Sequence, residues 1–190
     1  GRFDERLPKI LKEAKKLGCT TFVDPIQPHG RGYEFLKDSF EWIDILHCNN
    51  VEAESITSKT DPREALRFLT ESGVKLAIIT LGEEGLLAKL GLKALSVPAF
   101  KVDVVDPTGA GDAFCASVVH YLIRFAERTK STDPTALAGG EFIELLLEGE
   151  AAGAACVTDV GTTKAVTRKN VDRILREQEK KVRGKIRFLS

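Results

Sequence analysis

Short apolar segments with the length of β-strands alternate along this chain with longer segments of helical periodicity. Strands are predicted at residues 20–23, 43–48, 75–80, 86–90, 93–97 and 101–106. Helices are predicted at residues 7–17, 33–40, 110–128, 140–157 and 168–181, and two more begin after residues 49 and 61. Strands that alternate with helices of about ten or more residues typically run parallel in one sheet, because each helix carries the chain back across the sheet. The chain is therefore predicted to form an α/β fold with a mostly parallel sheet and helices on both faces.

Composition and charge are ordinary for a globular protein, and they narrow the class of partner. Hydrophobic residues make up 43% and charged residues 29% of the 190 residues, and Lys plus Arg equals Asp plus Glu at 28 each. This balance supplies no general attraction for nucleic acid or an acidic membrane surface. No apolar run reaches the ~18 residues of a membrane span. We expect one α/β domain over residues 1–190 with a small-molecule partner, and neither nucleic acid nor membrane.

The cysteines indicate the cellular compartment of the protein, and the first residue indicates whether the sequence is a fragment. The four cysteines show neither zinc-ligand spacing nor a disulfide framework; they are Cys19, Cys48, Cys115 and Cys156. With no signal-like segment at the start, we expect a cytoplasmic protein with reduced thiols. The sequence opens on Gly1 and contains no Met, so we expect a fragment of a longer chain.

The strongest chemical signal is the segment Asp106-Pro-Thr-Gly-Ala-Gly-Asp112, where a predicted strand becomes a helix. Gly109, Ala110 and Gly111 would let the main chain approach a phosphate closely, and the free amides and dipole of a helix N-terminus favour anions. Asp112 could stabilise the first turn by ~0.3 to 1 kcal/mol, or act as a general base beside a transferring phosphate. The spacing alone favours neither role.

Two further polar groups follow predicted strands. Thr80-x-Gly82-x-x-Gly85 could reach nucleotide phosphates or ribose, although a simple turn into a hairpin would have the same pattern. Asn49-x-x-Glu52 opens a helix after another strand. This pair could order water around a magnesium ion, but it also matches a capping box, in which the two side chains satisfy the helix N-terminus. Both interpretations stay open for each group.

Several familiar site patterns are absent from the sequence. The glycine segment ends on Phe114, where a dinucleotide fingerprint requires Gly, and it comes late in the chain. There is no G-x-x-x-x-G-K-[ST] phosphate loop and no G-x-S-x-G elbow. His29, His47 and His120 show no metal-ligand spacing, so no chemistry is assigned to them. A Rossmann-type oxidoreductase, a Walker-type nucleotide hydrolase and a serine hydrolase are therefore disfavoured.

Taken together and in this order, the segments that begin at Asn49, Thr80 and Asp106 closely resemble the PfkB family of sugar and nucleoside kinases. The resemblance extends from about Leu7 to the loop that ends at Gly161. It implies a ribokinase-like fold, which is a three-layer α/β/α sandwich, with the N-terminal part and the lid missing. Complete members carry an upstream Gly-Gly motif and sugar-binding residues that have no match here. The substrate is therefore not specified, and a homodimer would form through a region outside this chain.

The resemblance also implies an activity and residue roles. The activity is ATP-dependent phosphorylation of a hydroxyl group on a sugar or related small molecule, with Asp112 as general base and the amides of Gly109, Ala110 and Gly111 as the anion hole. The other implied site residues are Asn49, Thr80, Gly82 and Gly85 for ATP, Glu52 for Mg²⁺ through water, and Asp106, Thr108 and Gly161 for a monovalent cation such as K⁺.

Two other functional interpretations stay open. The chain could be a nucleotide-binding regulatory module or a catalytically incomplete fragment that keeps the ATP-binding fold without transferring phosphate. A nucleoside-specific kinase is a further alternative. The intact Asp112 and its preceding glycines favour a kinase, because a site released from catalysis would be free to lose them.

Overall fold

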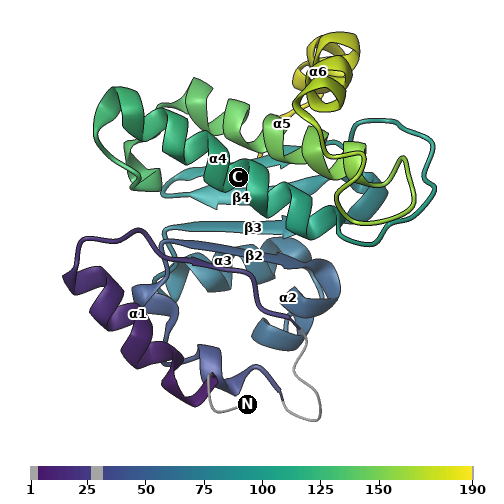
Figure 1. Cartoon of the computed structure of the whole chain (residues 1–190). Coiled ribbons are helices and arrows are strands. Elements are labelled where there is room, and N and C mark those ends of the chain that lie inside the picture. The colour runs from purple at the N-terminus through teal and green to yellow at the C-terminus, as the bar shows by residue number, and fades with distance from the viewer. Residues whose placement is uncertain (1–3, 27–31, 190) are drawn as a thin grey trace. The chain divides into compact units, whose positions relative to one another are not determined.

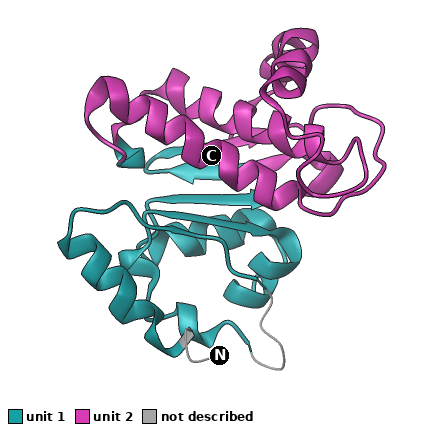
Figure 2. Ribbon diagram, in the orientation of Figure 1, with its two compact units in different colours: residues 1–80, 87–94, 133–135 teal, residues 81–86, 95–132, 136–190 magenta. Residues whose placement is uncertain are grey.

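The computed structural model describes residues 4–26 and 32–189, and the chain divides into two compact units (Figure 2). Unit 1 consists of Gly1–Thr80, Leu87–Ala94 and Asp133–Thr135, and unit 2 consists of Leu81–Leu86, Leu95–Thr132 and Ala136–Ser190. Each unit therefore combines segments that are far apart in the sequence. The single domain expected over residues 1–190 stays a prediction.

Unit 1 is built around parallel strands. β1 (Phe22–Val23), β2 (Ile45–Asn49) and β3 (Leu76–Thr80) pair in parallel, and Ile45 lies opposite both Phe22 and Leu76. β4 (Leu86–Leu90), which belongs to unit 1 from residue 87, follows β3 in the strand order. The first four residues of β2 and of β3 are all buried, so neither face of these strands meets water. Parallel strands typically show such continuous burial.

The helices of unit 1 begin where local sequence signals predict them. They are α1 (Leu7–Lys16), α2 (Asn50–Thr57) and α3 (Pro62–Glu71), all labelled in Figure 1. Asn49 caps α2, and Asp61 caps α3 by accepting a hydrogen bond from the Arg63 amide at 2.8 Å. Proline at the first position of α3 costs no hydrogen bond there. Both helix starts therefore follow from local sequence.

The prediction of a helix at residues 33–40 is wrong. The segment instead forms two short 3-10 helices, η2 (Glu34–Leu36) and η3 (Phe40–Trp42), and a third, η1 (Asp4–Arg6), precedes α1. Leu36 and Phe40 are buried, and the Phe40 ring packs edge-on against Phe68. Neither η2 nor η3 begins with a side-chain cap, and the packing of the two buried anchors holds the segment in place instead. The loop predicted at residues 27–32 lies, except for Gly32, outside the described residues.

Unit 2 is mainly helical. Its helices are α4 (Ala110–Thr129), α5 (Gly139–Cys156) and α6 (Arg168–Arg183), and α5 packs against both α4 and α6 (Figure 1). β5 (Lys93–Val97) pairs antiparallel with β6 (Arg187–Phe188) through Leu95 and Phe188. Two further short helices are η4 (Gly82–Glu84), in unit 2, and η5 (Pro134–Ala136), whose first two residues belong to unit 1. All three long helices were predicted within two residues of their ends, whereas β6 was not predicted.

The prediction of a strand at residues 101–106 is also wrong. The Lys101 amide donates to Gln178 Oε1 at 3.0 Å, and the Lys101 carbonyl accepts from Gln178 Nε2 at 2.9 Å. Further along, the Val105 amide donates to the Val157 carbonyl at 2.7 Å. These backbone groups are satisfied by α6 and by the loop after α5, so the segment needs no neighbouring strand.

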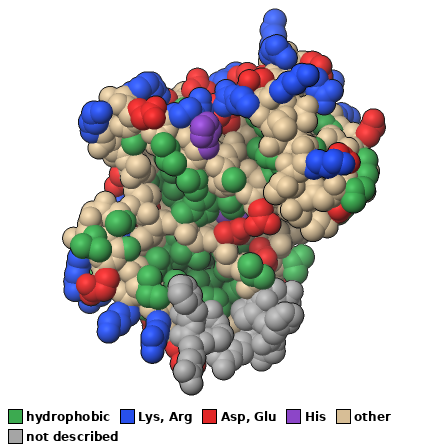
Figure 3. Space-filling view, in the orientation of Figure 1, with side chains coloured by type: hydrophobic (Ala, Val, Ile, Leu, Met, Phe, Trp, Pro, Cys, Tyr) green, Lys and Arg blue, Asp and Glu red, His purple; other side chains and the backbone are tan. Residues whose placement is uncertain are grey.

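The surface carries charges of both signs. On the face shown in Figure 3, Lys and Arg side chains are interspersed with Asp and Glu side chains. This agrees with the equal numbers of basic and acidic residues in the sequence. None of the helices within residues 4–26 and 32–189 is long and apolar enough to cross a membrane.

Candidate functional site

A tight turn before α4 requires glycine at position 109. Gly109 caps the helix with φ of +83°, in the left-handed region that residues with side chains rarely adopt. A Cβ there would lie 2.7 Å from Thr162 Cβ, so any side chain would collide with the loop after α5. The Ala113 amide donates to the Gly109 carbonyl at 2.9 Å and closes the first turn of α4. Conformation and space therefore both demand glycine.

The amides that follow this turn are available at the start of a helix. The amides of Gly111 and Asp112 lie in the first turn, where no intrahelical acceptor is available, and none of the described side chains caps them. The Ala110 amide reaches the Pro107 carbonyl only at 3.4 Å. Ala110 and Gly111 are half-buried, and Asp112 is exposed in the first turn. This end of α4 can hold an anion, with a carboxylate beside it.

α5 holds the start of α4 in place. A Cβ on Gly149 would lie 2.6 Å from the Phe114 ring, and a Cβ on Gly153 would lie 3.3 Å from the Ala110 carbonyl oxygen. Phe114 is buried, so its ring has little room to move away. The two glycines therefore allow α5 to approach the first turns of α4 closely, and this packing makes the turn before α4 rigid.

Asp106 ties the turn to the loop after α5. Its Oδ1 accepts from the Thr108 amide at 2.9 Å, and its Oδ2 accepts from the Gly161 amide at 3.4 Å. The Thr108 side chain first, and then these two amides, lower the pKa of Asp106. Burial and the charges of Asp106 and Asp112 raise the pKa of Cys156, whose Sγ lies 3.5 Å from the Thr108 carbonyl oxygen. The structure thus brings Asp106, Thr108 and Gly161 together around an ionised carboxylate.

The two glycines after β3 differ in their surroundings. Gly85 is buried with φ of +97°, and a Cβ there would overlap the Val97 carbonyl oxygen and lie 2.6 Å from the Ala99 amide nitrogen. Gly82 is exposed with φ of +60°, and no described atom lies within 4 Å of its Cβ position. Gly85 is therefore required for packing, whereas the backbone at Gly82 is open.

Asn49 and Glu52 form a capping box at the start of α2. The Asn49 amide donates to Glu52 Oε2 at 2.8 Å, and the Glu52 amide donates to Asn49 Oδ1 at 2.9 Å. In the β2–β3 register, Asn49 lies opposite Thr80. Burial first, and then the charge of Glu52, raise the pKa of Tyr33 to about 12. One of the two interpretations of this pair, the helix cap, is therefore confirmed, and a role at a metal stays a prediction.

A hydrogen-bonded chain of three side chains ends at Thr80. His47 Nδ1 lies 2.9 Å from Asp24 Oδ1, and His47 Nε2 lies 3.3 Å from Thr80 Oγ1. His47 is only 3% exposed, and Thr80 is half-buried. Metal-ligand spacing in the sequence does not indicate a role for His47. The alternation of side chains along a strand could have indicated one, because residues 47 and 49 point to the same face of β2.

The predicted site residues fall into two groups. Unit 1 holds Asn49, Glu52 and Thr80; unit 2 holds Gly82, Gly85, Asp106, Thr108, Gly109, Ala110, Gly111, Asp112 and Gly161. In unit 1 the strand register brings Asn49 beside Thr80. In unit 2 the residues from Asp106 to Asp112 form one turn, which the loop at Gly161 contacts.

Curated proteins similar to this chain include kinases. A family model described as pfkB family carbohydrate kinase matches residues 3–169. The ATP-dependent 6-phosphofructokinase of Thermoanaerobacterium thermosaccharolyticum is 32% identical over 130 residues, which cover 65% of this chain and 40% of that protein. The chain therefore spans about two fifths of the length of this curated relative.

Solved structures show the fold. Ribokinase from Thermotoga maritima matches with a TM-score of 0.70 and 26% identity, over 90% of this chain and 53% of that chain. A fructokinase double mutant from Vibrio cholerae O395, in a form with bound fructose, ADP and potassium ion, matches with a TM-score of 0.73 over 88% of this chain and 54% of that chain. Its 19% identity shows the fold alone. The expected ribokinase-like α/β fold is thus confirmed, and the match over residues 3–169 shows that the chain belongs to the pfkB family of carbohydrate kinases.

Proposed function

We propose that the protein containing this chain transfers the γ-phosphate of ATP to a hydroxyl group of a sugar or related small molecule, with Asp112 as general base. The start of α4 carries the proposal, because exposed Asp112 stands in the first turn beside amides that no described side chain caps. Membership of a carbohydrate kinase family supports the reaction class. The spacing of the four cysteines shows no disulfide framework, which supports a reducing compartment such as the cytoplasm.

Asp112 and the amides of the turn have separate tasks in this reaction. The Asp112 carboxylate takes the proton from the acceptor hydroxyl while that oxygen bonds to the γ-phosphorus and the bond to the leaving oxygen of ADP breaks. The amides of Gly109, Ala110 and Gly111 and the dipole of α4 stabilise the charge on the transferring phosphoryl group. Such a reaction depends mainly on positioning, and the close packing of α5 on α4 supplies it.

Asn49, Glu52 and Thr80 fit the phosphate side of a bound Mg-ATP. Bound Mg²⁺ would neutralise phosphate charge during transfer. Glu52 Oε2 is occupied by the Asn49 amide, which leaves the other carboxylate oxygen for a metal-bound water. The Thr80 hydroxyl and the open backbone at Gly82 are the proposed nucleotide contacts. Gly85 supports binding indirectly, because it allows the turn to pack.

Asp106, Thr108 and Gly161 fit a monovalent cation such as K⁺. The oxygen atoms that they offer to a cation are an ionised carboxylate and neighbouring backbone and hydroxyl oxygens. Hard cations prefer such ligands. The Gly161 amide already donates to Asp106, so Gly161 would contribute its carbonyl oxygen. A cation there would hold the loop after α5 against the turn at Gly109.

The proposed function is tested by phosphate transfer from labelled ATP into a pooled panel of sugars and nucleosides, with Mg²⁺ and K⁺ present. Asp112→Asn should lower the rate by ~10²- to 10⁴-fold, because the general base is lost. Asp103→Asn is the matched control, since Asp103 is an exposed carboxylate in the preceding loop. It should keep the wild-type rate.

Each alternative result has a definite meaning. Transfer by Asp112→Asn at the wild-type rate would refute the role of Asp112. Binding of Mg-ATP by the wild-type chain without any transfer would favour a nucleotide-binding module or a catalytically incomplete fragment. If the chain does not bind Mg-ATP at all, the proposed function is wrong for this chain.

A further inference from the structure

Asp24, His47 and Thr80 come from three neighbouring strands of unit 1 and lie on one face of the sheet. Val23 pairs with Leu46, so Asp24 follows β1 at the level of His47. Thr80 pairs with Asn49, two residues beyond His47 on β2. Paired residues of parallel strands, and residues two apart on one strand, share a face. The register therefore explains why the three side chains meet.

The hydrogen bonds of this chain fix the direction of the Thr80 hydroxyl group. Asp24 Oδ1 lies 2.9 Å from His47 Nδ1, and because a carboxylate only accepts, this contact pairs it with a protonated Nδ1. In the neutral imidazole the Nε2 atom then has none and accepts from the Thr80 hydroxyl, 3.3 Å away. The Thr80 oxygen consequently offers its lone pairs to any ligand that approaches. A second acceptor, the Cys48 carbonyl, lies farther from Thr80 Oγ1, at 3.5 Å.

His47 is held firmly enough to act as a fixed support. It is 3% exposed within a β2 strand whose neighbours Leu46 and Cys48 are fully buried, so its ring has little room to rotate. Thr80 is half-buried at the end of β3, directly before the turn that contains Gly82. A hydroxyl group that is oriented before binding loses less entropy when a ligand arrives.

We propose that Asp24 and His47 are positioning residues for nucleotide binding, and that they hold the Thr80 hydroxyl as a hydrogen-bond acceptor for a metal-bound water on the phosphate side of Mg-ATP. The inference rests on the proposed function, in which Thr80 contacts ATP. It adds two residues, neither of which belongs to the sequence motifs around Asn49, Thr80 and Asp112.

A double-mutant cycle on Mg-ATP affinity tests the proposal, measured by isothermal titration calorimetry on the chain itself. Thr80→Val removes the hydroxyl and should weaken binding about tenfold, the effect of one hydrogen bond to a charged or strongly polar group. His47→Asn removes the contact at Nε2 while it keeps a polar group near Asp24, and it should weaken binding to a similar extent. The double variant should be no weaker than Thr80→Val alone, because both changes remove the same interaction.

Two further variants separate positioning from a structural role. His47→Gln places an amide near the former Nε2 and should restore part of the affinity that His47→Asn loses. Asp24→Asn changes a side chain that is 34% exposed, so it should fold even if a change at buried His47 does not, and it should also weaken binding. His120→Asn, on the exposed surface of α4, is the matched control and should bind as the wild type does.

The protonation of His47 gives a readout that does not require ATP. Long-range ¹H–¹⁵N NMR spectra should show the proton on Nδ1, and Thr80→Val should shift the Nε2 resonance. A proton on Nε2 in the neutral ring would overturn the proposal, and so would unchanged ATP affinity in both His47→Asn and Asp24→Asn. Independent, multiplicative effects of His47→Asn and Thr80→Val would overturn it as well. If the wild-type chain does not bind Mg-ATP, the proposed function itself fails and this inference fails with it.

Discussion

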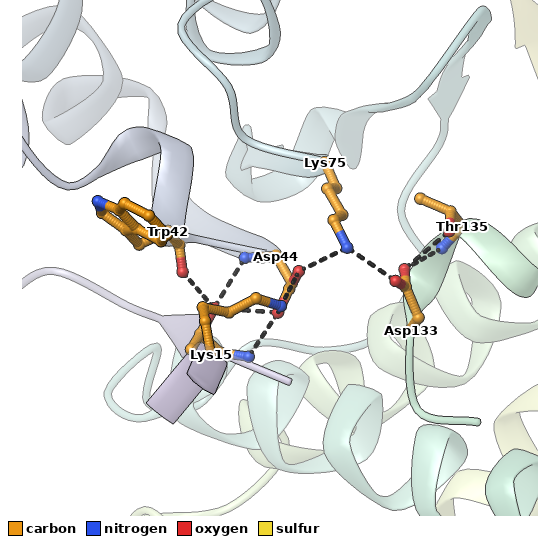
Figure 4. A network of polar contacts seen from close by, with 7 residues as sticks. Lys15, Trp42, Asp44, Lys75, Asp133 and Thr135 are labelled. Carbon is orange, nitrogen blue, oxygen red and sulfur yellow. Dashed lines mark hydrogen bonds and ion pairs between the residues drawn. The ribbon is translucent and has the colours of Figure 1, made fainter. Parts of the chain in front are cut away.

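Asp44 offers the sharpest test of what holds unit 1 together, because one buried carboxylate joins three segments (Figure 4). Lys15 Nζ lies 2.6 Å from Asp44 Oδ2, and Lys75 Nζ lies 2.9 Å from Asp44 Oδ1. The Thr21 amide donates to Asp44 Oδ2 at 2.8 Å. Lys75 Nζ also forms an ion pair with Asp133 Oδ2 at 2.7 Å. The Asp44 side chain is only 2% exposed, so its charge depends on these partners.

The substitution Asp44→Asn keeps the shape of the side chain and an acceptor for Thr21, but it removes the charge. Breaking a buried ion pair typically costs about 3 to 5 kcal/mol, because the remaining charge is left uncompensated. The Lys15 and Lys75 side chains are 27% and 35% exposed and can turn to water. We therefore expect the free energy of unfolding to fall by about 2 to 3 kcal/mol at pH 7.

The same network predicts a pH dependence. Burial alone would raise the pKa of Asp44, but the hydrogen bonds from Lys15, Thr21 and Lys75 outweigh burial and lower it. A lowered pKa in the folded state stabilises the fold above the unfolded-state pKa of about 3.9, and this stabilisation is lost as the pH falls through the folded-state value. The difference between the wild type and Asp44→Asn should therefore shrink below about pH 4.

Urea unfolding followed by circular dichroism at pH 7 and at lower pH measures both effects. Asp133→Asn is the matched control, because Asp133 contacts the same Lys75 but its side chain is 40% exposed. It should cost no more than about 1 kcal/mol, the usual range for exposed pairs. A loss for Asp44→Asn no larger than that of the control at pH 7 would refute the reasoning.

Three further substitutions test individual buried positions by thermal unfolding. Burial raises the pKa of Glu150 to about 8, so the folded state holds this side chain neutral, and the fold loses stability as the pH rises through that value. Glu150→Gln should therefore raise the melting temperature at pH 9 and change it little at pH 5. The buried Tyr33 hydroxyl finds no hydrogen-bond partner among the described residues, so Tyr33→Phe should be neutral or stabilising by up to about 1 kcal/mol, and a clear loss would show that the hydroxyl is satisfied. Gly149→Ala should cost about 1 to 3 kcal/mol through overlap with a buried α4 ring, whereas Gly140→Ala, with no described atom within 4 Å of its Cβ position, should gain stability; equal effects would contradict the packing argument.

Elements whose signals are local were predicted well. The strands at residues 86–90 and 93–97 have the predicted bounds, because Gly91 with φ of +57° turns one short apolar run into the next. The start of α4 was placed correctly because the glycine segment marks it. Residues 101–106 alternate like a strand, yet their backbone partners lie at Gln178 and Val157, and no local pattern encodes those contacts.

The candidate site shows the same division. The hydrogen bonds of Asn49 and Glu52 span three residues, so the spacing alone predicts a capping box. The contacts of His47 with Asp24 and Thr80 span 23 and 33 residues and depend on the register of three strands. A strand that is one residue out of register would turn His47 to the other face, and the sequence alone does not determine the register.

Structural and functional interpretations of a site residue need not compete. The capping box uses one Glu52 oxygen and orients the carboxylate, so the second oxygen points in a direction that the helix start determines. In the same way, the amides of Thr108 and Gly161 hold the Asp106 carboxylate in place, and with the Thr108 side chain, which has the largest effect, they lower its pKa. A ligand that binds such groups meets donors whose orientation the fold has already fixed, and it loses less entropy than with free side chains. Evidence for the cap is therefore no argument against a metal-bound water at Glu52.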